Sequence, residues 1–149
     1  MVMIFDLLSV DRIKILETTD KNEALKEMCD ILATADSITD KDELEKAIFD
    51  RENIMSTSIG LGIAIPHVRL KSVTAMSVAI GVAKHGIDYK SFDEMPVHTI
   101  IMIAAPEGAH REYLSVLAKI ALLLKNESIR KKILDAESPQ DIYDSLKGH

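Results

Sequence analysis

Two apolar, β-rich stretches lie in the middle of this chain, at residues 73–82 and 97–104. Both are mostly apolar along their whole length, which is typical of strands that are buried on both faces of a sheet. Such a sheet needs covering layers, and segments with helical spacing of apolar residues stand before and after it. The sequence therefore predicts an α/β sandwich with a mixed, mainly parallel central sheet flanked by helices.

The flanking helices are predicted from apolar side chains that recur at helical spacing. Their starts are marked by residues that cap helices: Asp20 or Asn22 for the first, Thr39 or Asp40 for the second, and Ser138 for the last. A turn is expected at residues 84–86. We expect the helices over residues 20–33, 40–52, 110–125, 128–135 and 139–146.

The most unusual segment follows the second predicted helix. Residues 56–62 form a loop of small side chains, residues 63–65 a short strand, and Pro66 stands immediately before His67. Proline fixes its own φ and holds the preceding residue in extended geometry, so His67 is presented in a defined direction. From the residues alone, two interpretations stay open: His67 faces an anion, or it is a partly buried side chain that holds a turn by hydrogen bonding.

The loop before His67 has the composition of an anion site. Gly60 and Gly62 let backbone N–H groups approach a ligand closely, and Thr57 and Ser58 offer hydroxyl donors. Arg51 closes the preceding helix, where the helix dipole favours a cation, and it is also a candidate phosphate clamp. These five residues are the candidate phosphate-binding groups.

His110 is a second candidate, at the start of the strongest predicted helix. The positive end of the helix dipole disfavours a charged imidazole, and a neutral ring there can donate an N–H to a phosphate oxygen. The alternative is a plain polar residue that begins a helix. His67 and His110 each follow an apolar strand, so the two together are stronger candidates for a functional site than either one alone.

Composition excludes several classes of function. The net charge is −6, and the chain has three Phe, three Tyr and no Trp, so we expect no nucleic-acid partner. Glycine-rich nucleotide motifs and the spacing of histidine metal sites are absent, so we expect no cofactor and no metal.

The single cysteine and the short apolar runs indicate where in the cell the protein is found. Cys29 lies in an amphipathic helical pattern and is expected to be a packed thiol. No apolar run is long enough to cross a bilayer, and no basic segment precedes the apolar N-terminus. We expect a cytoplasmic protein with no direct membrane insertion.

The segment that ends at His67 carries a family resemblance. It resembles the enzyme IIA domains of the fructose/mannitol class of the bacterial phosphoenolpyruvate-dependent sugar phosphotransferase system, which include stand-alone nitrogen-regulatory relatives. The segments at residues 86–89, 95–98, 105–118 and 138–142 also resemble this family, closer to its fructose type. The motif begins at Glu52 and is matched by Ile59, Gly60, Ile63, Ala64, Ile65, Pro66 and His67.

The resemblance implies one enzyme IIA type-2 domain over residues 1–149 that serves as a phosphotransferase component. His67 would accept a phosphoryl group from the histidine phosphocarrier protein and pass it to a cysteine of enzyme IIB, for uptake of fructose or a related sugar. His110 would match the second active-site histidine, and Arg51 the basic residue near the phosphate. Enzyme IIB and the membrane enzyme IIC are expected as separate chains, since no such segment is present here.

Several alternatives stay open at this point. The output could instead be regulatory, with phosphorylation controlling binding to transporters, kinases or transcription factors. A homodimer and the identity of the reacting ring nitrogen are also open. Val68 departs from the small residue usual in the family, and Ser58 from the common glycine, so Val68 either narrows the approach of a partner or points away.

Overall fold

The computed structural model describes residues 3–149, and Met1 and Val2 lie outside the described residues. The helices are α1 (Lys21–Leu32), α2 (Lys41–Ile54), α3 (His110–Leu124), α4 (Glu127–Asp135) and α5 (Pro139–Ser145), with short 3-10 helices η1 (Ile4–Leu7) and η2 (Val10–Arg12). The strands are β1 (Ile13–Ile15), β2 (Ser58–Gly60), β3 (Ile63–Ala64), β4 (His67–Leu70), β5 (Ser77–Ile87) and β6 (Val97–Pro106).

The strands form one sheet in the order β1-β5-β6-β3-β2, with β4 also paired to β6. Three of the pairings, β1–β5, β3–β6 and β4–β6, are parallel, while β5–β6 and β2–β3 are antiparallel. The predicted α/β sandwich with a mixed, mainly parallel sheet is confirmed.

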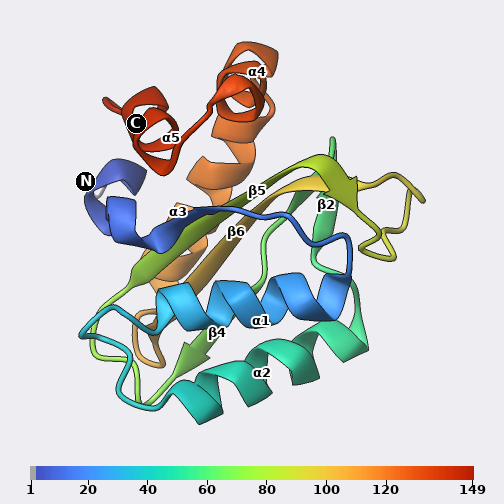
Figure 1. The fold of residues 1–149 in the computed structure, drawn as a ribbon. Coiled ribbons are helices and arrows are strands. Elements are labelled where there is room, and N and C mark those ends of the chain that lie inside the picture. The colour runs from blue at the N-terminus through green and yellow to red at the C-terminus, as the bar shows by residue number, and fades with distance from the viewer. Residues whose placement is uncertain (1–2) are drawn as a thin grey trace.

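Helices cover both faces of this sheet (Figure 1): α1 and α2 lie on one face, and α3, α4 and α5 lie on the other. Side chains of β5 alternate between the two cores. Ala79 packs on the α1–α2 side, whereas Val78 and Ile80 pack on the α3 side. Both faces are apolar because both are covered, which is why the strand reads as a continuous apolar run.

The helices begin close to the predicted caps. The carboxylate of Asp20 accepts the N–H of Glu23, and the carboxylate of Asp40 accepts the N–H of Glu43. Ser138 caps α5 as predicted, and α4, capped by Asn126, begins at Glu127, one residue before the predicted start. Each cap satisfies an N–H that the helix leaves without a partner.

The predicted turn at residues 84–86 is wrong, because these residues belong to β5. Gly86 has a φ of +85°, and the pairing of β5 with β6 shifts register between Val82 and Ile87. A Cβ at Gly86 would lie 2.9 Å from the Cβ of Pro96. The glycine therefore allows an irregularity inside the strand, and the chain does not reverse there.

Three short strands, β1, β2 and β4, were not predicted as strands. Each has no more than four residues, and each is held by pairing with a strand or segment elsewhere in the sheet. No helix within residues 3–149 is long and apolar enough to cross a membrane.

Candidate functional site

His67 opens β4, which runs parallel to β6 with His67 opposite Ile103. The carbonyl oxygen of Pro66 accepts the N–H of Ile103 at 2.9 Å, which fixes the start of the strand. Side chains alternate along a strand, so His67 and Arg69 project from one face and Val68 from the other. Val68 is buried in the core on the α1–α2 side, and it therefore points away from His67.

The imidazole of His67 is half-buried and held by one backbone group. Its Nδ1 atom lies 2.6 Å from the carbonyl oxygen of Ile65. A carbonyl oxygen only accepts, so Nδ1 carries the proton of the neutral ring. Nε2 is then left with its lone pair available to a reaction partner.

Tyr113 of α3 packs beside His67, with ring centroids 5.6 Å apart and an interplanar angle of 51°. Burial raises the pKa of Tyr113 to about 12, against the opposing effect of the nearby charges of Arg69 and Arg51. The phenol therefore stays protonated and neutral at ordinary pH. The neutral Tyr113 ring therefore packs against one side of the His67 imidazole.

Arg69 extends the site along β4. Its guanidinium carbon lies 5.5 Å from the centroid of the Tyr113 ring, and Nη1 donates to the carbonyl oxygen of Glu107 at 3.2 Å. Sequence reasoning missed both residues, although a signal existed for each. Arg69 stands two positions after His67 on a strand, and Tyr113 stands three positions after His110 on a helix, and both spacings place side chains on a shared face.

Arg51 lies in the last turn of α2, as predicted, and is half-buried. Its Nη1 donates to the carbonyl oxygen of Met55 at 3.4 Å. Its charge lowers the pKa of Tyr113, which counteracts part of the effect of burial, so the guanidinium lies within electrostatic range of that phenol. The predicted position of Arg51 at the end of α2 thus places its charge where Tyr113, the ring beside His67, responds to it.

His110 is the first residue of α3, one turn before Tyr113, and its side chain is exposed. The same helix end therefore carries both residues. Within residues 3–149 no hydrogen bond joins His110 to His67. The imidazole of His110 is therefore open to solvent and is not held by His67.

Thr57 and Ser58 are both buried, and their hydroxyl groups are engaged within the protein. The hydroxyl of Thr57 donates to Glu52 Oε2 at 2.6 Å, and the Ser58 hydroxyl accepts from Ser56 Oγ at 3.1 Å. The structure therefore turns the Thr57 side chain toward the interior. Its hydroxyl proton is committed to a carboxylate.

Gly60 and Gly62 adopt left-handed φ values of +87° and +74° where β2 connects to β3. The carbonyl oxygen of Gly62 accepts the N–H of His98 at 2.8 Å. His98 stands five positions before Ile103, the partner of His67, and strands rise by about 3.3 Å per residue. The glycine turn thus lies about 16 Å along β6 from Ile103, the partner of His67. The structure therefore does not bring Gly60 and Gly62 together with His67.

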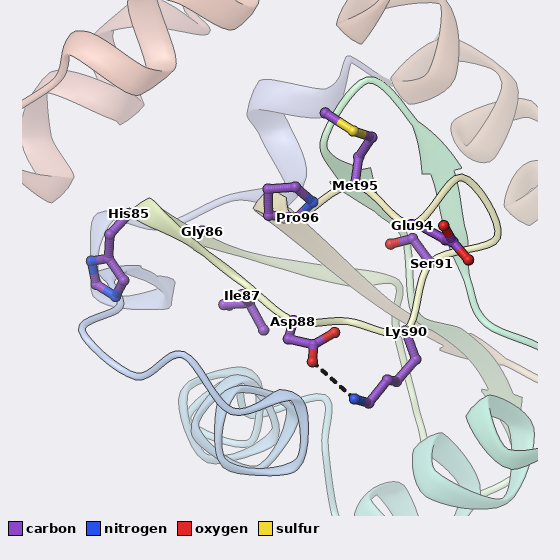
Figure 2. A pocket seen from close by; sticks show the side chains of 9 residues that line it. All are labelled: His85, Gly86, Ile87, Asp88, Lys90, Ser91, Glu94, Met95 and Pro96. Carbon is purple, nitrogen blue, oxygen red and sulfur yellow. Dashed lines mark hydrogen bonds and ion pairs between the residues drawn. The ribbon is translucent and has the colours of Figure 1, made fainter.

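A cleft of about 490 Å³ lies at the opposite end of β5, near its pairing with Val97 (Figure 2). Figure 2 shows the Asp88–Lys90 ion pair at its edge, and Ser91, Glu94 and Met95 line it. None of the predicted site residues lines this cleft. Among residues 3–149, no group of three or more histidine, cysteine, aspartate or glutamate side chains could hold a metal ion.

Comparison with known proteins places residues 6–149 in a family model described as "Phosphoenolpyruvate-dependent sugar phosphotransferase system, EIIA 2". The chain is 41% identical over 147 residues to a PTS system fructose-specific EIIABC component of Bacillus subtilis, covering 98% of this chain and 23% of that protein. It is 32% identical over 126 residues to a PTS system fructose-specific EIIA component of Haloferax volcanii, covering 85% of this chain and 82% of that protein.

A solved structure shares the fold closely. The nitrogen regulatory protein IIA-Ntr from Neisseria meningitidis superposes with a TM-score of 0.87 at 28% identity, over 96% of this chain and 98% of that one. The chain therefore spans nearly the full length of this relative, but less than a quarter of the Bacillus subtilis protein.

Proposed function

Because the chain belongs to the EIIA 2 family of the phosphoenolpyruvate-dependent sugar phosphotransferase system, we propose that it carries a phosphoryl group on His67. The observation that supports this most is the Nδ1 contact of His67 with the Ile65 carbonyl oxygen. This contact leaves Nε2 as a neutral nucleophile in a half-buried position, and neutral imidazole is competent at ordinary pH.

The proposed reaction has two transfers. In the first, a bond forms from Nε2 of His67 to phosphorus as the bond from phosphorus to the donor's histidine breaks. In the second, the bond to Nε2 breaks as a cysteine thiolate of the acceptor attacks phosphorus. Such transfers depend on in-line positioning and on stabilising the charge of the phosphoryl oxygens.

The charges around His67 suit this role. Arg51 and Arg69 approach the phenol of Tyr113 from two elements, and His110 begins α3 one turn away. A guanidinium can hold two phosphoryl oxygens at once, and the His110 ring can donate an N–H. We assign charge stabilisation to Arg51 and His110, with Arg69 as an additional contributor from β4. The hydroxyl of Thr57 is assigned no direct contact, because it is bound to Glu52.

The proposed donor is the histidine phosphocarrier protein, and the proposed acceptor is a cysteine of enzyme IIB, which serves the membrane enzyme IIC. The name of the Bacillus subtilis relative joins EIIA with B and C components, and the names of both relatives specify fructose. We therefore propose fructose or a related sugar as the transported substrate. Cys29, a buried free thiol, suits the reducing cytoplasm, where we propose that the chain acts.

A regulatory output is the second candidate, because the Neisseria meningitidis nitrogen regulatory protein shares the fold at a TM-score of 0.87. In that case the same phosphorylation of His67 would control binding to a transporter, a kinase or a transcription factor. Onward transfer separates the two candidates. We expect a transport component to lose its phosphoryl group to a fructose-type enzyme IIB, and a regulator to retain it.

Reconstitution tests the proposal. Phosphoenolpyruvate, enzyme I and the histidine phosphocarrier protein should place acid-labile phosphate on the chain. His67→Ala should carry none, while His85→Ala is the matched control, because His85 is exposed at the other end of β5 and should label as the wild type does. Label retained in folded His67→Ala, or none in the wild type with active donors, would contradict the proposal.

A further inference from the structure

A buried ion pair joins the start of α1 to the end of α2. Lys21 Nζ, from the first turn of α1, lies 2.9 Å from Glu52 Oε1, from the last turns of α2. Only 3% of the Glu52 side chain and 16% of the Lys21 side chain are exposed. Burying a carboxylate is costly unless it is paired and fully hydrogen-bonded, so its remaining contacts indicate what it does.

Both oxygens of Glu52 hold Thr57. Oε1 accepts the Thr57 N–H at 3.0 Å, and Oε2 accepts its hydroxyl proton at 2.6 Å. The hydroxyl has one proton and gives it to Glu52, so Tyr89 donates its O–H to Thr57 Oγ1 across 3.0 Å. The Lys21 ammonium lies 4.4 Å from the centroid of the Tyr89 ring. Thr57 is thereby held through its N–H and its side chain at once.

Two further hydrogen bonds connect Thr57 to the imidazole. The Thr57 carbonyl oxygen accepts the N–H of Ile65 at 3.0 Å, and the Ile65 carbonyl oxygen accepts Nδ1–H of His67 at 2.6 Å. Pro66, between these two residues, has a fixed φ and adds little freedom of its own. The position of Thr57 therefore sets where the acceptor of the Nδ1 proton lies.

We propose that Glu52 is a positioning residue for His67, acting through Thr57 and Ile65 to select the imidazole tautomer that leaves Nε2 unprotonated. This rests on the proposed function of His67 as the phosphoryl acceptor. Glu52 touches neither His67 nor the phosphoryl group. Its role is to keep the Ile65 carbonyl oxygen in line with Nδ1.

The amide variant Glu52→Gln separates position from charge. The amide oxygen of glutamine can accept from the Thr57 N–H and from Lys21, and its NH₂ can donate to Thr57 Oγ1. The hydroxyl proton of Thr57 then turns to the oxygen of Tyr89, and the buried Tyr89 proton loses its acceptor. The two contacts that hold Thr57, through its N–H and through Oγ1, keep their geometry without the carboxylate charge, so Glu52→Gln should rescue the positioning that Glu52→Ala loses.

The test compares Glu52→Gln, Glu52→Ala and Thr57→Val with the full-length wild type. The imidazole ¹⁵N chemical shifts of His67 give the fraction of the Nδ1–H tautomer, and a rapid-quench assay with the phosphorylated phosphocarrier protein gives the rate of phosphoryl uptake. We expect the wild type and Glu52→Gln to hold mainly the Nδ1–H tautomer at rates within about 3-fold of each other. Glu52→Ala and Thr57→Val should show mixed tautomers and uptake slowed by roughly 10- to 100-fold.

Asp88→Ala is the matched control. Asp88 precedes Tyr89 and forms an exposed ion pair with Lys90 (Figure 2), but it has no hydrogen bond to Thr57 or Glu52 within residues 3–149. Its removal perturbs the same segment without touching the Thr57 contacts. We expect its His67 tautomer and uptake rate to equal those of the wild type.

If Glu52 and Thr57 served only as structural anchors, their substitution would lower the free energy of unfolding and leave the His67 tautomer unchanged in folded molecules. That result, in Glu52→Ala and Thr57→Val, would overturn the proposal. If Glu52→Ala does not fold, Thr57→Val decides, because valine keeps the shape and the N–H contact. The tautomer is measured without phosphoryl transfer, so a wild type that takes up no phosphate would contradict the proposed function and leave this test intact.

Discussion

The Nδ1 atom of His67 lies 2.6 Å from the carbonyl oxygen of Ile65, two residues earlier in the chain. Pro66 between them has no N–H, and its carbonyl oxygen is bound to Ile103. The acceptor of the Nδ1 proton is therefore part of the same rigid turn that presents the ring. This short-range contact therefore leaves Nε2 as the ring nitrogen that can react.

Phosphorylation of the wild type should occur at Nε2 of His67. Nδ1 carries a proton held by a carbonyl oxygen, whereas Nε2 has a free lone pair. Two-bond and one-bond couplings in ¹⁵N and ³¹P NMR spectra of the phosphorylated protein distinguish the two nitrogens. A phosphorus–Nδ1 coupling would show that the ring turns over before it reacts.

His110→Ala should keep part of its labelling by the phosphocarrier protein and lose more of its onward transfer. The exposed imidazole at the start of α3 is free to donate to a phosphoryl oxygen, and loss of one such donor slows transfer by about 10- to 1000-fold. Quench-flow rates of both transfers check this. Equal and unimpaired rates would remove His110 from the site.

Arg51→Ala should slow phosphoryl uptake by about 10- to 100-fold, because a cation within electrostatic range of Tyr113, the ring beside His67, is lost. Arg51→Lys should recover only part of this rate, since an ammonium cannot bind two oxygens in a planar fork. Lys46→Ala on the same helix is the control, as Lys46 is exposed and pairs with Asp50. A full recovery with lysine would show that charge alone is required.

Tyr113→Phe should label at nearly the wild-type rate, because the phenol is neutral at ordinary pH and the ring contact with His67 is kept. Tyr113→Ala should lower the free energy of unfolding by about 3 kcal/mol through the cavity it leaves, and should slow uptake as His67 loses its support. Urea unfolding and the labelling assay measure the two effects. A large loss in the phenylalanine variant would instead give the hydroxyl a role of its own.

Cys29 should make stability fall with pH above about 9. Burial chiefly, with smaller contributions from Glu45 and Asp30, raises the pKa of its thiol from 9.0 to about 12. The native state then binds more protons than the unfolded state between these values, so stability is full below pH 9 and is lost as pH rises toward 12. The slope from this group is up to about 1.4 kcal/mol per pH unit.

Urea unfolding of the wild type and of Cys29→Ala at pH 8 and pH 10.5 measures that slope. The alanine variant should lose less stability between the two conditions, although it starts lower because it forfeits contacts such as that with Met102. Iodoacetamide should alkylate Cys29 only in urea. Rapid alkylation of the native protein at pH 8.5 would contradict the buried, protonated thiol.

The features that sequence reasoning captured are those decided within a few residues. The caps at Asp20, Asp40 and Ser138 act over three positions, and the apolar run through β5 reports burial on both faces. The presentation of His67 by Pro66 is of the same kind. Its prediction as the key residue also used a family motif, and the reactive nitrogen came only with the Ile65 contact.

The residues that surround His67 come from segments that are distant from it in sequence. Gly60 and Gly62 stand close to it in sequence, yet an extended segment separates residues by about 3.3 Å each, so the glycine turn lies near His98. Tyr113, far away in sequence, packs on the ring because α3 returns across the sheet. Thr57 was predicted to face a phosphate, and its hydroxyl is bound by the buried Glu52.

The α/β class, the helix starts and the rigid turn that carries His67 follow from the amino-acid sequence alone, because these depend on local backbone preference and on apolar periodicity. The charges that surround the ring, the direction of Val68 and the free ring nitrogen became known only from the folded chain. Those outcomes depend on pairing β4 with β6 and on packing α3 against the sheet, and contacts between distant segments leave no mark at short sequence spacing.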